Sequence, residues 1–219
     1  MQVFCDFDGT VSVVDTTDLV LERLAAPEWA DFEADWLAGP IDAAACMRGQ
    51  VALIGASEAE LDAVLDTVPL DPGFPAFAAW CADNSVPLTI VSDGVDRFIR
   101  RVLARHSLAR LPVVSNVLAG TAGARRLEQP HARQGCAAGA GVCKCEAAAG
   151  RIGSAEMLVY VGDGRSDFCV SHRADLLFAK GALADYVRGR GEPHHPFETF
   201  HDITATLAPL VEARRAAAL

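Results

Sequence analysis

The 219-residue sequence predicts an α/β protein: a doubly wound parallel sheet with an inserted all-helical cap. Short β-branched and apolar runs alternate with segments of helical periodicity, the pattern typical of parallel sheets with right-handed crossovers. Between about 15 and 71 the alternation stops, and helical patterns follow one another directly. Polar motifs also stand at the ends of three expected strands, which is where ligands bind in such sheets.

Each expected strand is a short apolar run bounded by turn-forming residues. The strands lie at about 2–6, 86–92, 112–117, 156–162 and 175–179. Apolar residues spaced three and four apart predict the core helices, which lie at about 73–83, 94–106, 143–150, 166–173 and 200–216. Residues 1–14 and 72–219 therefore form the predicted catalytic core.

The predicted cap, residues 15–71, is a series of helices with no strand between them. Proline and glycine separate four helical patterns, at 15–26, 28–38, 41–54 and 57–67. Ser57 followed by Glu60 predicts a capping box at the start of the last one. An insert directly after the first strand is placed to close over the ends of the other strands.

The composition, 51% hydrophobic and 22% charged residues, is typical of a globular protein, and no apolar run reaches the length of a membrane span. Twenty-nine acidic and nineteen basic residues give a net charge of −10. This charge argues against nucleic acid or an anionic membrane as a partner. A cleaved leader would remove Asp6, so we expect a cytoplasmic protein. The sequence leaves the oligomeric state open.

The first strand runs into Asp6-Phe7-Asp8-Gly9-Thr10, the most informative stretch of the chain. Its two carboxylates lie two residues apart at a strand end, and Gly9 permits a sharp turn after them. Carboxylate oxygens there suit a hard cation such as Mg²⁺ and leave one carboxylate free to attack an electrophile. The competing interpretation is a solvated Asp-Gly turn, which is common after strands.

Three further motifs follow and favour the chemical interpretation. They are Ser92-Asp93-Gly94 after an apolar strand, then Lys144, then Asp163 with Asp167 after a later strand. An acidic pair, a hydroxyl, a lysine and a second acidic pair in this order resemble the four motifs of the haloacid dehalogenase superfamily of phosphatases. The resemblance covers nearly the whole chain and implies a Rossmann-like core with a small helical cap of the first type.

The resemblance implies an Mg²⁺-dependent phosphomonoesterase that acts on a small phosphorylated metabolite through an aspartyl-phosphate. Asp6 would be the nucleophile, and Asp8 would protonate the leaving oxygen and later deprotonate water. Lys144 would neutralise the phosphoryl oxygens and hold the carboxylate of Asp6. The implied metal ligands are Asp6, Asp8, Asp163 and Asp167, and the implied phosphate-binding residues are Thr10, Ser92, Asp93, Gly94 and Lys144.

Several of these residues also have an ordinary structural interpretation. Ser92 would equally serve as a helix N-cap, and the second acidic pair would be favourable at a helix N-terminus without any metal. Thr10 is expected to cap the turn after Asp8 and orient that carboxylate. Lys144 would by itself be a solvated lysine, but it is one of only two lysines in the chain, with Lys180.

Within the superfamily, the chain looks most like the 2-hydroxy-3-keto-5-methylthiopentenyl-1-phosphate phosphatases of methionine salvage and, more distantly, the phosphoserine phosphatases. Pro27-Glu28-Trp29, Asp15 nine positions beyond Asp6, and the cysteine-rich loop before the lysine carry this likeness. Asp15 and Arg48 are the candidate specificity residues. Asp15 would otherwise cap the helix that follows it, and Arg48 would otherwise be solvated.

Two other classes of function are alternatives. A response-regulator receiver domain also places acids, a hydroxyl, a lysine and Mg²⁺ on a parallel sheet, but its phosphoacceptor lies on a later strand and it has no helical insert. A non-catalytic phosphate-binding module would be expected to have lost a motif residue. The residues in question, Asp6, Asp8, Lys144 and Asp163, are all present.

Most of the seven cysteines lie in apolar stretches and are expected to be reduced core residues. Cys136, Cys143 and Cys145 instead cluster in a Gly/Ala-rich loop around Lys144. A structural zinc site with His131, a redox-sensitive thiol pair and ordinary packing all stay open, because the spacing matches no standard zinc pattern.

Overall fold

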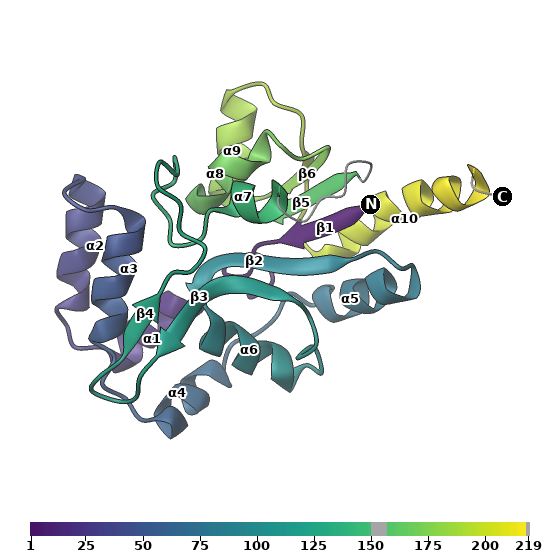
Figure 1. The fold of residues 1–219 in the computed structure, drawn as a ribbon. Helices are drawn as coiled ribbons and strands as arrows, with labels where there is room; N and C mark the ends of the chain where they lie inside the picture. Colours follow the sequence, from purple (N-terminus) through teal and green to yellow (C-terminus); the bar gives the residue numbers. More distant parts are fainter. Residues whose placement is uncertain (150–156, 218–219) are drawn as a thin grey trace.

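A computed structural model describes residues 1–149 and 157–217 of the protein (Figure 1). Its centre is a seven-stranded sheet with the order β4-β3-β2-β1-β5-β6-β7. All neighbouring strands pair in parallel except β3 and β4, which are antiparallel. The predicted α/β class with a mainly parallel sheet is therefore confirmed.

The strands follow the short apolar runs of the sequence. They are β1 (Gln2–Cys5), β2 (Leu88–Val95), β3 (Val113–Ala119), β4 (Arg126–Glu128), β5 (Leu158–Gly162), β6 (Leu176–Ala179) and β7 (His195–Pro196). Five of them match predicted strands, although the predicted start of the fourth, at position 156, lies outside the described residues. The predictions missed β4 and β7, because segments of three and two residues are too short to show a period.

The helices before β5 are α1 (Thr16–Leu24), α2 (Trp29–Ala38), α3 (Ala43–Ala52), α4 (Glu58–Leu65), α5 (Phe74–Asp83), α6 (Asp96–Arg105) and α7 (Lys144–Ala149). A 3₁₀ turn (Arg165–Asp167), α8 (Phe168–Ser171), α9 (Gly181–Gly189) and α10 (Phe200–Ala217) follow. The predictions missed α9, a short helix with glycine at both ends, and the predicted end of α7 at position 150 lies outside the described residues. No helix in the described ranges has both the length and the apolar character that a membrane crossing requires.

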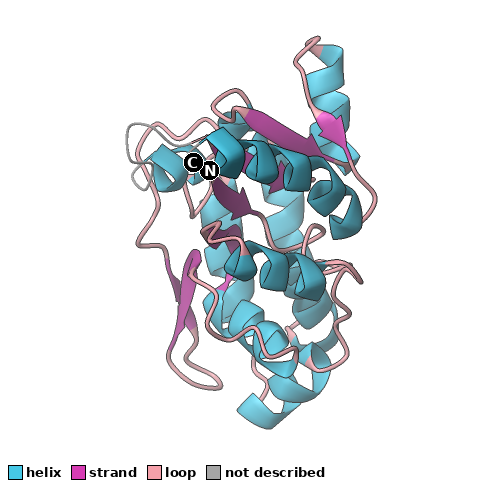
Figure 2. Ribbon diagram, turned by 90° about the vertical axis from the view of Figure 1, so that its right-hand side faces the viewer, coloured by secondary structure: helices cyan, strands magenta, loops and turns pink. Residues whose placement is uncertain are grey.

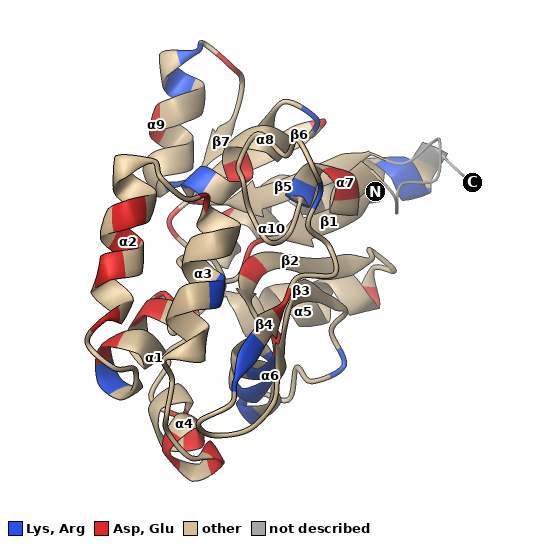
Figure 3. Cartoon of the chain, turned by 60° about the vertical axis from the view of Figure 1, so that its left-hand side comes forward, with Lys and Arg blue, Asp and Glu red and all other residues tan. Residues whose placement is uncertain are grey.

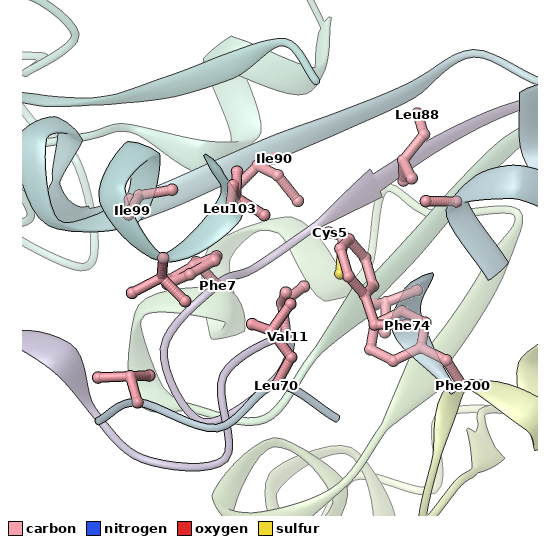
Figure 4. Packing of buried hydrophobic residues seen from close by; sticks show 14 of the residues in the cluster. Cys5, Phe7, Val11, Leu70, Phe74, Leu88, Ile90, Ile99, Leu103 and Phe200 are labelled. Atoms are coloured by element: carbon pink, nitrogen blue, oxygen red, sulfur yellow. The ribbon is translucent and has the colours of Figure 1, made fainter. Parts of the chain in front are cut away.

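Successive side chains of β1 point to opposite faces of the sheet. Val3 and Cys5 belong to an apolar cluster with residues of α5, α6 and α10, whereas Phe4 belongs to a second cluster with residues of α8 and α9. Figure 4 shows Cys5 beside Phe74 of α5 and Phe200 of α10, whose rings meet edge to face with centroids 4.8 Å apart. Helices thus cover both faces of the sheet (Figure 2), as the doubly wound class requires.

The four helices of the insert have two kinds of surroundings. α1 and α4 contribute Val20 and Leu61 to the larger apolar cluster. Basic residues of α6 lie beside acidic residues of α4 (Figure 3), and Arg101 pairs with Asp66 at 2.7 Å. The α2–α3 hairpin stands away from the central strands, beside the edge strand β4 (Figure 1). The boundaries of the cap, 15–71, stay a prediction; within that range the hairpin is the part most separate from the core layers.

Asp71 joins the starts of α5 and α10, because its Oδ1 accepts hydrogen bonds from the backbone N–H groups of Gly73 at 2.8 Å and Phe200 at 3.1 Å. Asp71→Ala would leave two buried donors without a partner. We expect the free energy of unfolding, measured by denaturant titration, to fall by about 1–3 kcal/mol. Asp83→Ala, which removes an exposed carboxylate of α5, should change it by no more than about 0.5 kcal/mol. Equal effects of the two substitutions would contradict the assigned role of Asp71.

Candidate active site

The sequence motifs meet at one edge of the sheet. β1 pairs in parallel with both β2 and β5, so the carboxyl ends of the three strands lie side by side. A cavity of about 1340 Å³ lies at this edge and extends to the α2–α3 hairpin. Its lining includes Asp6, Asp8, Ser92 and Asp163 from the core and Asp15, Trp36 and Met47 from the insert.

Asp6 is held in one orientation. Its Oδ1 accepts a hydrogen bond from the backbone N–H of Phe7 at 2.7 Å, and its Oδ2 lies 2.6 Å from Nζ of Lys144. Burial and the charge of Asp167 raise the pKa of Asp6 well above its ordinary value, while Lys144 opposes the shift. A further cation beside this carboxylate would lower the pKa again, which is a first reason to expect a metal ion here.

Lys144 is completely buried and has three polar partners. Besides Asp6, its Nζ contacts Oδ1 of Asp167 at 2.6 Å and donates to Oγ of Ser166 at 2.8 Å. Burial alone would lower the pKa of Lys144, but the carboxylates of Asp167 and Asp6 raise it overall. Lys144 is therefore a permanent cation placed against the carboxylate that the family resemblance makes the nucleophile.

Asp167 is fully buried, and each of its two carboxylate oxygens accepts hydrogen bonds from two donors. Oδ1 accepts hydrogen bonds from Nζ of Lys144 and from the hydroxyl of Tyr160, each at 2.6 Å. Oδ2 accepts from the backbone N–H groups of Asp163 at 3.1 Å and Gly164 at 3.0 Å. Asp167 therefore positions Lys144 and the turn after β5, and has little capacity left for a direct metal bond.

Asp163 is the more open member of this acidic pair. Its Oδ1 accepts from Oγ1 of Thr10 at 2.5 Å. Its Oδ2 lies so close to Gly9 that a Cβ at that position would collide with it, and Gly9 has a φ of +71°. Glycine is thus required there both by the backbone conformation and by the close approach of the carboxylate.

The oxygens of Asp6, Asp163 and Asp167 offer ligand atoms that lie within 4.8 Å of one another. Hard carboxylate oxygens are the donors that Mg²⁺ prefers, so the donor set fits this ion. Because Asp167 is already saturated, Asp6 and Asp163 are the members of the group that have lone pairs to offer.

Asp8 has one restrained and one unpaired oxygen. Oδ1 accepts from both the backbone N–H and the hydroxyl of Thr16, at 2.8 and 2.6 Å. Oδ2 lies against Gly94 and has no hydrogen-bond partner in the described part of the chain. Burial, and after it the negative charge of Asp15, raise the pKa of Asp8 to about 8. At neutral pH the carboxyl is largely protonated, as a proton donor should be.

Thr10 was expected to orient the carboxylate of Asp8, and this expectation is wrong. Thr10 donates to Asp163, and Thr16 orients Asp8 instead. The sequence held a signal for Thr16, since it is the first residue of α1, directly after the cap residue of that helix. Tyr160 was also missed; its hydroxyl is the single side-chain polar group in the apolar run of β5, and such a group requires a buried partner.

The motif around Ser92 lies in a strand and not at a helix start. β2 continues to Val95, its pairing with β3 shifts register after Val91, and α6 begins only at Asp96. Oγ of Ser92 accepts from the backbone N–H of Gly94 at 2.9 Å, and the hydroxyl lines the cavity.

Asp93 connects the motif to the loop that leads to Lys144. Its carboxylate accepts from Nδ2 of Asn116 in β3 at 3.1 Å and from the backbone N–H of Val142 at 2.9 Å. These contacts assign its side chain to holding the loop, a role that the sequence did not reveal.

The two candidate specificity residues, Asp15 and Arg48, lie in different surroundings. Asp15 lines the cavity and also caps α1, where its Oδ1 accepts from the backbone N–H of Asp18 at 2.9 Å. Arg48 hydrogen-bonds the side chain of Gln129 and is not among the residues that line the cavity. The structure therefore brings Asp15, and not Arg48, to the site.

Comparison with known proteins bears on the same residues. The sequence model of the haloacid dehalogenase-like hydrolase family matches residues 3–172. The 2-hydroxy-3-keto-5-methylthiopentenyl-1-phosphate phosphatase of Brevibacillus brevis is 28% identical, with 94% of both chains covered. The enzyme of the same name from Geobacillus kaustophilus is 31% identical, again with 94% of both chains covered.

Solved structures share the fold. A phosphoserine phosphatase with a phospho-aspartyl intermediate analogue matches with a TM-score of 0.67 and 16% identity, covering 94% of this chain and 97% of that one. A probable phosphoserine phosphatase from Vibrio cholerae matches with a TM-score of 0.75 and 19% identity, covering 99% and 67%. The family match spans most of the length and includes all four motifs. This chain belongs to the haloacid dehalogenase-like hydrolase family.

Proposed function

We propose that this chain, a phosphatase of the haloacid dehalogenase-like hydrolase family, is an Mg²⁺-dependent phosphomonoesterase that works through an aspartyl-phosphate on Asp6. The observation that carries the proposal is the contrast between two carboxylates two residues apart. Asp6 is paired with a buried lysine, whereas Asp8 has a raised pKa and an unpaired oxygen. The first is suited to attack phosphorus, and the second to move a proton.

In the first step, Asp6 attacks phosphorus while Phe7 and Lys144 keep its carboxylate in place. The bond from phosphorus to the leaving oxygen breaks, and Asp8 gives its proton to that oxygen. Lys144 balances charge on the phosphoryl oxygens, and the hydroxyl of Ser92 is available to donate to one of them. Positioning and charge neutralisation of this kind supply most of the catalysis in phosphoryl transfer.

In the second step, Asp8 is a carboxylate and accepts a proton from water as the water attacks the phosphoryl group. The acyl-phosphate bond breaks, and Asp6 is restored. Thr16 restrains Oδ1 of Asp8 in both steps, so the unpaired Oδ2 is the atom that gives and later receives the proton.

We propose that Asp6 and Asp163 hold Mg²⁺, with the backbone carbonyl of Asp8 as a further oxygen ligand and Asp167 ordering the surroundings. When bound, Mg²⁺ neutralises charge on the transferred phosphoryl group. Thr10 keeps the carboxylate of Asp163 oriented for this role.

As substrate we propose 2-hydroxy-3-keto-5-methylthiopentenyl-1-phosphate, the compound in the names of the relatives above. Its name describes a chain that ends in a methylthio group, and the hairpin side of the cavity presents Trp36 and Met47. Aromatic and thioether side chains suit such a group. Phosphoserine is the alternative substrate, because Asp15 and Asp18 on the cavity wall would attract its ammonium group.

Metal dependence tests the enzymatic proposal directly. Purified protein should hydrolyse a generic aryl phosphate in the presence of Mg²⁺, lose this activity with EDTA, and regain it when Mg²⁺ is restored in excess. Undiminished turnover after metal removal would contradict the proposed metal role. Phosphate binding without any turnover would favour the non-catalytic alternative.

The two carboxylates should respond differently to loss of charge. Asp6→Asn should abolish turnover, because no acyl-phosphate can form. Asp8→Asn should slow turnover by about 10²–10⁴-fold, the usual range for a positioned acid or base. The control is Asp83→Asn on the exposed surface of α5, which should keep the full rate. A wild-type rate in Asp6→Asn would exclude the covalent mechanism.

Asp15 should affect specificity more than chemistry. Asp15→Asn keeps a residue that caps helices well but removes the charge that faces the cavity. We expect kcat/KM to fall strongly for the preferred metabolite and much less for a small aryl phosphate. Asp31→Asn on α2, outside the cavity lining, is the matched control. Equal losses on both substrates would place Asp15 in the catalytic machinery or the fold.

A further inference from the structure

Four thiols lie beside the site without a part in the proposed mechanism. Cys136 and Cys143 come from the loop that leads into α7, Cys145 lies in the first turn of α7, Cys169 comes from α8, and all four line the cavity. Each is a free cysteine. Cys143 and Cys145 flank Lys144 in the chain, so a covalent bond between them would affect the position of the lysine.

Cys143 and Cys145 are in direct contact, with Sγ atoms 3.4 Å apart. A disulfide needs about 2.05 Å, so the sulfur atoms would have to approach by about 1.4 Å. The residue between them in the chain is Lys144. Its Nζ is held by Asp6 and Asp167 at 2.6 Å each, and a shift of the main chain on both sides of the lysine would disturb these contacts.

A zinc cage is not formed by these thiols. Among residues 1–149 and 157–217, the only group of three or more candidate ligands within 4.8 Å of one another is the acidic one of Asp6, Asp163 and Asp167. His131, the expected fourth zinc ligand, contacts the loop through its backbone carbonyl, which accepts from the N–H of Cys143 at 3.0 Å.

The two cysteines differ in exposure. Cys145 is half-buried and open to the cavity, whereas Cys143 is only 5% exposed. An oxidant entering the cavity would therefore meet Cys145 first, and Cys143 is in place to react with the product. Burial raises the pKa of the Cys145 thiol, which keeps it mostly protonated and slows its oxidation at neutral pH.

We propose that Cys143 and Cys145 form a reversible oxidation site that inactivates the phosphatase by displacing Lys144. The loss of activity rests on the proposed function above, whereas the formation of the disulfide does not depend on that function. The oxidant is a peroxide such as hydrogen peroxide. The Cys145 thiolate takes one peroxide oxygen to give a sulfenic acid, and the other oxygen leaves as water. The Cys143 thiolate then attacks that sulfur, the S–S bond forms, and the second oxygen leaves as water. Two electrons pass to the peroxide, and a dithiol reverses the step.

The test uses the full chain with Mg²⁺ and an aryl phosphate. Treatment with hydrogen peroxide, followed by its removal, should lower turnover at least about tenfold, and a dithiol should restore it. Trypsin cleaves after Lys144 and so separates the two cysteines into peptides 134–144 and 145–151. In the oxidised protein these peptides should stay linked through Cys143 and Cys145, and reduction should release them.

Single-cysteine variants show which two thiols form the disulfide. Cys145→Ser should keep the basal rate and lose the dithiol-reversible inhibition, and Cys145→Ala serves if the serine variant does not fold. Cys136→Ser removes the second thiol of peptide 134–144, and should remain sensitive and still form the link.

Several results would overturn the proposal. They are inhibition that persists in Cys145→Ser, a link from Cys145 to Cys169, a Cys143–Cys145 disulfide that leaves turnover unchanged, or stoichiometric zinc in the purified protein. Absence of turnover in the reduced protein would instead refute the proposed function, and the peptide link would still decide whether the thiol pair forms.

Discussion

The rest of the site depends on the buried contact of Lys144 with Asp6 and Asp167. The lysine has no solvent contact, and its charge is balanced by two carboxylates at 2.6 Å. Loss of one partner from such a group leaves an uncompensated buried charge, at a cost of roughly 3–5 kcal/mol. The three residues belong to α7, the end of β1 and the turn after β5. The ion group therefore joins three segments that are distant in the chain, and the site assembles only as the fold itself does.

Much of this arrangement is predictable from local sequence. Apolar runs locate the strands, and parallel pairing then brings the residues after them, Asp6 and Asp163, to one edge. Contacts between segments that are distant in the chain are not predictable in this way. The carboxylate of Asp93 accepts from the backbone N–H of Val142, 49 residues further along the chain, and no local pattern marks that pairing. The short strands β4 and β7 are missed for another reason, since three and two residues are too few to show a period.

The insert lines the cavity with α1 and with the α2–α3 hairpin, and these two parts are anchored to the core differently. α1 and α4 are packed on the core and cannot be separated from it without exposing apolar residues, whereas the α2–α3 hairpin has fewer such ties. One contact across the cavity is made by Arg165, in the turn after β5, whose guanidinium lies 5.8 Å from the ring centroid of Trp36 on the hairpin. An arginine over an aromatic ring is a modest attraction, about 0.5–1 kcal/mol where exposed. The side of the cavity formed by the hairpin therefore has fewer buried apolar ties to the core than the side formed by α1.

β1 lies between β2 and β5 in the sheet, and this position constrains the length of the strand more strongly than it constrains the amino acids in it. Val3 pairs with both Leu88 and Val159, so the register of β1 is set from both sides. Swaps between apolar residues of similar size in the strand are accommodated by repacking. Insertion or deletion of a single residue before Asp6 would exchange the two faces of the strand and turn the carboxylate away from Lys144. Apolar substitutions can therefore accumulate in β1 during evolution, whereas insertions and deletions in this strand cannot.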